Sequence, residues 1–155
     1  MIPPFNEHGD LPPGAHESTW AEFEARFGFT ARRRELLVSL RCVLDLLQRA
    51  GVTGGWVGGS FVTTKPEPGD VDLCWDLHGS VDAERLGAEF WNGDGLAGTA
   101  DFADLDVMPD DPELGLVRMV LSHTSEGRAR GTVLLRLGAH SPGADSDDVC
   151  GGSDP

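Results

Sequence analysis

The stretch that decides the fold is Trp56-Val57-Gly58-Gly59-Ser60, which nine residues separate from Asp70-Val71-Asp72. The first segment has the pattern of a short apolar strand that ends in a glycine-serine turn. The second has the pattern of a strand with two carboxylates at positions i and i+2. Side chains of an extended chain alternate between faces, so Asp70 and Asp72 share one face while Val71 points to the other. This arrangement predicts a site for a divalent cation.

The same turn suits a phosphate group. Gly59 removes the side chain where a phosphate would approach the backbone, and Ser60 offers a hydroxyl beside a backbone N–H. The carboxyl groups of Asp70 and Asp72 start roughly 7 Å apart along a strand and can lean toward one or two hard cations. We therefore expect phosphates, cation and acidic pair to share one pocket. The alternative is that Gly59-Ser60 is an ordinary turn and that both aspartates are exposed residues of an edge strand.

Taken together, Gly59-Ser60, nine intervening residues and Asp70-x-Asp72 resemble the signature of the nucleotidyltransferase superfamily. That fold is shared by DNA polymerase beta, tRNA-nucleotide adding enzymes and the minimal nucleotidyltransferases of toxin–antitoxin pairs. The resemblance implies that Gly59 and Ser60 hold a nucleoside triphosphate and that the paired aspartates bind Mg²⁺.

A third acidic residue on a neighbouring strand completes the metal site of that superfamily. Its best match here is Asp106, in the segment Ala103–Met108, where carboxylates again stand at alternate positions. Asp104 is the other candidate. A general acidic run is the competing interpretation, because further aspartates surround both positions.

A narrower resemblance is to a poorly characterised bacterial and phage group of small nucleotidyltransferase-like proteins. It covers about residues 3–137 and names no substrate. It rests on two segments, Phe5-Asn6-Glu7-His8-Gly9-Asp10-Leu11-Pro12-Pro13-Gly14 and Gly59-Ser60-Phe61-Val62-Thr63.

The resemblance implies a magnesium-dependent enzyme that moves a nucleoside monophosphate from a nucleoside triphosphate, with ATP as the expected donor, to a hydroxyl of a protein or an RNA. Asp70, Asp72 and Asp106 would be its catalytic and metal-binding residues. Lys65, the only lysine of the chain, is a candidate phosphate contact, with a solvent-facing loop lysine as the alternative. A second class also stays open, a non-catalytic nucleotide-binding or protein-interaction module of a toxin–antitoxin or phage-defence system. A third is a magnesium-dependent nuclease or phosphatase.

The composition limits the partners. The formal net charge is −14, with 26 acidic and 12 basic residues, so extended DNA binding along a basic groove is not expected. A compact nucleotide with magnesium is compatible with this charge, because the metal offsets it locally. Three widely spaced cysteines fit a reducing cytoplasm, and no apolar run approaches the length of a membrane span. We expect a cytoplasmic protein without membrane contact.

The chain is expected to form one domain with two flanking segments. Residues 1–17 read as an irregular N-terminal arm, residues 18–138 as the nucleotidyltransferase-like domain, and residues 139–155 as a disordered acidic tail. The expected fold class is α/β (α+β), a small mixed β-sheet flanked by helices, with strands around Val57, Val71, Asp106 and Val133.

Capping and periodicity place the helices. Thr19-x-x-Glu22 is a capping box for a helix from Trp20 to about Arg26. Thr30 caps a longer helix over residues 31–50, whose leucines follow the i, i+3, i+4, i+7 pattern. Two further helices are expected at 81–91, capped by Ser80, and after Asp111-Pro112. The basic cluster 32–34 is either an anion or partner contact or a solvated helix surface.

Overall fold

The computed structural model describes residues 1–78, 80–86, 100–102, 104–111 and 113–138. Within these residues six strands form one sheet in the order β1-β6-β2-β3-β5-β4. The strands are β1 (Ala15–Ser18), β2 (Gly54–Gly58), β3 (Val71–Asp76), β4 (Ala100–Phe102), β5 (Leu105–Asp110) and β6 (Thr132–Arg136). Strand β1 runs parallel to β6 and β3 runs parallel to β5, whereas the other neighbouring pairs are antiparallel. This mixed sheet confirms the predicted fold class.

The four predicted strands are β2, β3, β5 and β6. Strands β1 and β4 have no predicted counterpart, and the expectation that residues 1–17 are irregular is wrong at the end of that segment. Ala15 pairs with Thr132, and the following residues continue the parallel ladder. The arm is also anchored upstream, because Leu11 is fully buried. The predicted tail, residues 139–155, lies outside the described residues.

The helices within the described residues are α1 (Trp20–Phe27), α2 (Ala31–Arg49), α3 (Ala83–Leu86) and α4 (Leu116–Leu121). Two begin at the predicted caps. The Thr19 side chain accepts from the Glu22 N–H at 3.1 Å, and the Thr30 hydroxyl accepts from the Arg33 N–H at 3.2 Å. Both contacts satisfy N–H groups that the first turn of a helix leaves without partners.

The two later helices begin after their predicted positions. Helix α3 begins at Ala83 because Asp82 takes the capping role expected of Ser80, its carboxylate accepting from the Glu84 N–H at 3.0 Å. The remainder of the predicted 81–91 helix lies outside the described residues. Helix α4 begins at Leu116, because Gly115 has a left-handed φ of 62° that interrupts a helix running on from Asp111.

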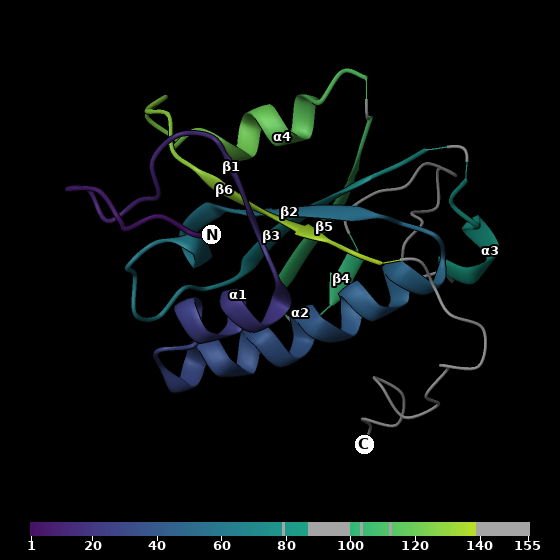
Figure 1. Cartoon of the computed structure of the whole chain (residues 1–155), viewed down its shortest axis with the longest axis horizontal. Coiled ribbons are helices and arrows are strands. Elements are labelled where there is room, and N and C mark those ends of the chain that lie inside the picture. The colour runs from purple at the N-terminus through teal and green to yellow at the C-terminus, as the bar shows by residue number, and fades with distance from the viewer. Residues whose placement is uncertain (79, 87–99, 103, 112, 139–155) are drawn as a thin grey trace.

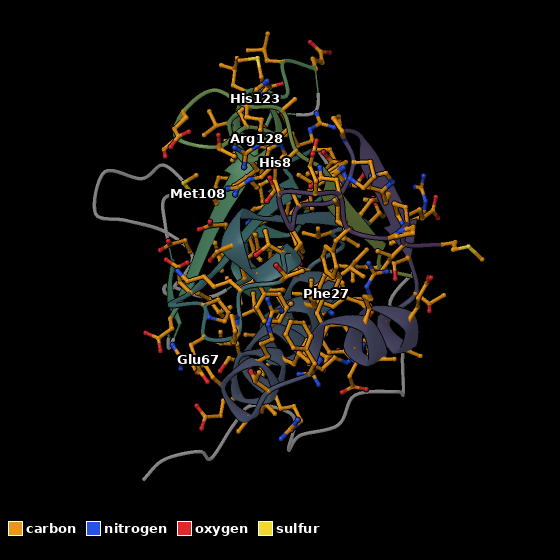
Figure 2. The ribbon with its side chains drawn as sticks, turned by 90° about the vertical axis from the view of Figure 1, so that its left-hand side faces the viewer. His8, Phe27, Glu67, Met108, His123 and Arg128 are labelled. Carbon is orange, nitrogen blue, oxygen red and sulfur yellow. The ribbon has the colours of Figure 1, made fainter. Side chains whose placement is uncertain are left out.

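The hydrophobic core lies between one face of the sheet and helices α1 and α2 (Figure 1). Inward-facing strand residues such as Val57, Leu73 and Val107 are buried against the apolar stripe of α2. Phe27 of α1 lies in this layer, whereas His123 and Arg128 lie beyond the other side of the sheet (Figure 2). Across the described residues, no helix combines the length and the apolar character that a membrane span requires.

The opposite face of the sheet carries the polar residues of the alternating pattern. Gly58 pairs with Asp72, which pairs in turn with Asp106 on β5. Residues directly opposite one another on paired strands share a face, so these three lie in one row on the side away from α2. Helix α4 covers part of this face (Figure 1). The row formed by Gly58, Asp72 and Asp106 on this face is the candidate for a functional site.

Candidate functional site

Three carboxylates meet on this face. Asp70 directly precedes β3, Asp72 lies within that strand, and Asp106 lies on β5. The parallel register places Asp72 opposite Asp106, and one ligand oxygen from each of the three residues lies within 4.8 Å of the others. Carboxylate oxygens are the ligands that hard divalent cations such as Mg²⁺ prefer. The structure thus brings together the three acids that the sequence analysis selected.

The carboxylates destabilise one another as anions. Burial, followed by the charges of Asp70 and Asp106, raises the pKa of Asp72 from 3.8 to about 7. Burial, followed by the charge of Asp106, also raises the pKa of Asp70. A bound cation would favour the charged forms of Asp70 and Asp72. The donor set and its electrostatics therefore both fit a divalent metal.

Gly59 closes one side of this acidic site. It begins the short 3₁₀ turn η1 (Gly59–Val62) with a left-handed φ of 73°. A Cβ atom at this position would collide with Oδ2 of Asp72, so the turn approaches the carboxylate as closely as it does only because residue 59 is glycine. Ser60 follows in the same turn and is half-buried. The Gly-Ser turn and the acidic pair therefore form one site.

Lys65 lies at the edge of the acidic site. Its side chain is exposed, and its positive charge acts to lower the pKa of Asp70 against the larger effect of burial. Its backbone is fixed, because the Lys65 carbonyl accepts from the Arg33 guanidinium at 2.7 and 2.9 Å. The lysine is therefore an exposed cation on a fixed loop beside Asp70.

Asp104 does not belong to the acidic triad. Its backbone takes a left-handed φ of 70°, and its carboxylate forms an ion pair with Arg32 at 2.9 Å. The same arginine donates to the carbonyl of Gly69 at 2.8 Å, directly before Asp70. Between the two candidates for the third acid, the geometry selects Asp106.

Arg33 has a structural role that neither interpretation of the basic cluster anticipated. It is fully buried, and its guanidinium donates to the backbone carbonyls of four residues: Phe27, Phe61, Thr63 and Lys65. Burial lowers its pKa to about 10. Arg32 and Arg33 together hold the connection between the Gly-Ser turn and Asp70. Position 33 is one turn before the apolar residues Leu36 and Leu37, and this spacing is the one signal in the sequence that favours burial.

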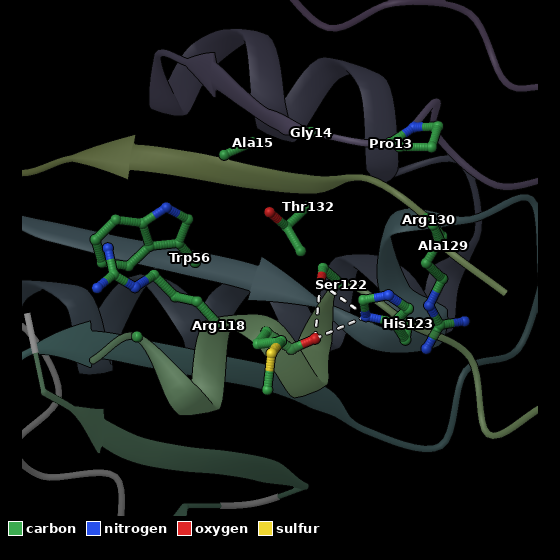
Figure 3. A pocket seen from close by; sticks show the side chains of 12 residues that line it. Pro13, Gly14, Ala15, Trp56, Arg118, Ser122, His123, Ala129, Arg130 and Thr132 are labelled. Atoms are coloured by element: carbon green, nitrogen blue, oxygen red, sulfur yellow. Dashed lines mark hydrogen bonds between the residues drawn. The ribbon is translucent and has the colours of Figure 1, made fainter. Parts of the chain in front are cut away.

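A cavity of about 530 Å³ lies near the acidic site, on the same side of the sheet. Sequence reasoning missed it, because its walls come from three distant segments: the arm at 13–15, strand β2 at Trp56, and residues 115–132. Trp56 and Arg118 lie at one end, with His123 and Arg130 at the other (Figure 3). Arg118 stacks over the Trp56 ring, 4.4 Å from its centroid.

Residues 3–133 match a family model that is described as a family of unknown function, DUF6932. No curated protein and no solved structure matches this chain.

Proposed function

The chain belongs to this family of unknown function, and from the geometry of its acidic site we propose that it is a magnesium-dependent nucleotidyltransferase. The observation that carries the proposal is the meeting of Asp70, Asp72 and Asp106 within 4.8 Å, with the backbone of Gly59 in contact with one of these carboxylates. An acidic triad beside a glycine-serine turn is suited to a metal-bound polyphosphate.

The donor would be a nucleoside triphosphate, ATP first among them. Gly59 and Ser60 would contact its phosphates through backbone N–H groups and the serine hydroxyl, and Lys65 would extend to the phosphates from the exposed loop. The three aspartates would hold the metal. The chemistry that bound magnesium supplies is neutralisation of the triphosphate and a lower pKa for the acceptor hydroxyl.

In the transfer, the acceptor oxygen bonds to the α-phosphorus, the bond from that phosphorus to the pyrophosphate oxygen breaks, and the hydroxyl proton leaves to solvent. The acceptor would be a hydroxyl of a protein or an RNA. Self-modification at tyrosine is excluded, because the chain contains no tyrosine. We propose a cytoplasmic location for this reaction, where the buried free thiol of Cys74 stays reduced.

The test is calorimetric titration of each nucleoside triphosphate with magnesium into the wild type and into a double variant, Asp70→Asn with Asp72→Asn. Saturable binding that requires magnesium and is lost in the double variant is expected. Asp104→Asn is the matched control, because that acid lies outside the triad, and it should retain binding. Release of pyrophosphate in the presence of an acceptor then tests transfer. A folded wild type that binds no nucleoside triphosphate would overturn the proposal.

A second candidate function, a non-catalytic protein-interaction module of a toxin–antitoxin or phage-defence system, is favoured by one observation. Helix α4 exposes more than half of the surface of three apolar side chains, Leu116, Met119 and Val120. Exposed apolar side chains that gather on one element are typical of interaction surfaces. Such a module would keep its partner after Asp72→Asn and would release no pyrophosphate, whereas a nuclease or phosphatase would yield hydrolysed product without transfer.

A further inference from the structure

The 530 Å³ cavity contains none of the proposed metal or nucleotide ligands. Among the described residues that line it are three basic side chains, Arg118, His123 and Arg130, and no carboxylate. The charge of Arg118 is offset by its ion pair with the buried Asp110, so Arg130 and His123 are the groups that attract an anion. This wall contrasts with the chain as a whole, in which 26 acidic residues outnumber 12 basic ones. The volume is within the range of small-molecule sites. The cavity therefore favours an anionic ligand of modest size.

Arg130 is placed to contact such a ligand directly. Its backbone N–H donates to the Ser122 carbonyl at 2.8 Å and so closes a hairpin after α4. An ion pair of 2.8 Å between Arg128 and the buried Asp10 ties that hairpin to the arm. The Arg130 Nε is buried and has no hydrogen-bond partner among the described residues. Because this N–H has almost no accessible surface, a ligand oxygen can accept from it only once the side chain turns toward the cavity, and this would satisfy a buried donor.

His123 lies at the same end of the cavity (Figure 3). Its Nδ1 lies 2.9 Å from the Met119 carbonyl and 3.0 Å from the Ser122 hydroxyl. Because a carbonyl oxygen can only accept, Nδ1 carries a proton in the contact with Met119. The other ring nitrogen, Nε2, then accepts a hydrogen bond from a P–OH group when the ring is neutral, and donates one to a phosphate oxygen when the ring is an imidazolium. This end of the cavity thus offers a guanidinium and an imidazole together.

The other end of the cavity is formed by two flat, firmly held groups, the Arg118 guanidinium and the Trp56 ring. Arg118 is held by an ion pair of 2.7 Å with the buried Asp110 and stacks on Trp56. Its guanidinium face can therefore support a ring or a sugar without first losing side-chain freedom.

We propose that this cavity binds a small phosphorylated molecule, with its phosphate on Arg130 and His123 and its organic part over Arg118 and Trp56. The site is separate from the metal site and does not need a divalent cation. The net charge of −14 opposes a polyanion, which would have to cross acidic surface, but it opposes a single phosphate much less. The positive charge of Arg130 acts to lower the pKa of Asp72, so the two sites lie within electrostatic reach of each other.

Ribose 5-phosphate is the probe, titrated calorimetrically in a buffer that contains EDTA, with ribose as the uncharged comparison. Saturable binding of the phosphate ester alone is expected. Arg130→Gln should weaken it about ten- to a hundred-fold. Arg136→Gln is the matched control, because Arg136 is 65% exposed and, among the described residues, forms its ion pair with Glu17 at the surface; it should change the affinity by less than about twofold.

The binding must also be located and separated from the metal site. The indole N–H resonance of Trp56, identified by its loss in Trp56→Phe, should shift on titration. The double variant Asp70→Asn with Asp72→Asn should retain the affinity, so this site can persist where nucleotide binding fails. His123→Gln provides a second lesion at an exposed position and should weaken binding several-fold, whether or not Arg130→Gln folds. The proposal is overturned if ribose 5-phosphate does not saturate the wild type, or if a folded Arg130→Gln or His123→Gln variant binds it as tightly as the wild type does. It is also overturned if this binding requires magnesium, or if a short RNA binds to the cavity more tightly than ribose 5-phosphate does.

Discussion

Gly59 and Asp72 are in direct contact: the position that a Cβ of residue 59 would occupy is taken by Oδ2 of the Asp72 carboxylate. Strand register explains the contact, because Asp72 pairs with Gly58, the last residue of β2, and the chain turns immediately afterwards. The shape of the acidic triad therefore depends on a residue that contributes no side chain.

Gly59→Ala is expected to weaken magnesium binding about tenfold or more, because the new methyl group displaces the Asp72 carboxylate. The left-handed φ of 73° adds strain of about 1 to 2 kcal/mol to the folded state. Magnesium titration and urea denaturation measure the two effects. Gly69→Ala is the matched control, since a Cβ there would meet no atom within 4 Å, and it should change the free energy of unfolding by less than about 0.5 kcal/mol. Equal magnesium affinity in wild type and Gly59→Ala would contradict the contact.

Asp106→Asn should weaken magnesium binding about tenfold, because it removes one of three charged ligands. Asp104→Asn, a change of the same chemistry two residues away, should leave the affinity within about threefold, since Asp104 is paired with Arg32. Calorimetric titration of magnesium into both variants checks the difference. The reverse order of effects would transfer the role of third acid to Asp104.

Without divalent cations, stability should fall as the pH rises. Asp72 has a pKa of about 7 in the folded protein, against an ordinary value of 3.8, so the folded state holds a proton that the unfolded chain has lost. The stabilisation from this proton is complete below about pH 4 and disappears as the pH rises through 7. Between pH 5 and pH 8 the wild type should lose on the order of 1 to 2 kcal/mol more than Asp72→Asn, a value reduced from the full shift because the carboxyl is only half-buried. Urea denaturation in EDTA at both pH values makes the comparison. Equal losses of unfolding free energy in the wild type and in Asp72→Asn would refute the prediction.

Arg33→Met should destabilise the fold by about 3 kcal/mol or more, because it leaves the carbonyls of the turn and the following loop without their donor. Arg34→Met, at the neighbouring exposed position, should cost less than about 1 kcal/mol. Urea denaturation compares the two. Similar losses would mean that Arg33 acts as a surface residue.

The parts of the fold that local pattern determines could be predicted. Helix α2 ends at Arg49 where the prediction ended at residue 50, because its cap and its leucine spacing lie within the helix itself. Alternation put Asp70 and Asp72 on one face of a strand, whereas Asp106 was the best match for a third acid only through the resemblance, with Asp104 left open. The strand register, which places Asp72 opposite Asp106, then identified Asp106 as the third member of the triad.

The parts that depend on distant partners could not be predicted. Strand β1 has the sequence Ala-His-Glu-Ser, which lacks an apolar alternation, and it forms because its backbone pairs with β6. Arg33 is buried because carbonyls of a loop about thirty residues away surround its guanidinium. The cavity joins three segments that no local pattern relates. In each case the determining contact is a tertiary one.

The parallel pairing of Ala15 with Thr132 also has a consequence for synthesis on the ribosome. Strand β1 emerges early and then waits without a partner until β6 has been translated, whereas β2, β3 and β5 can pair before that. The acids of the triad can therefore assemble on a nascent chain before the wall formed by residues 13–15 and 129–132 closes. Among the segments that the structure describes, the wall of the cavity is the last to gain its partners.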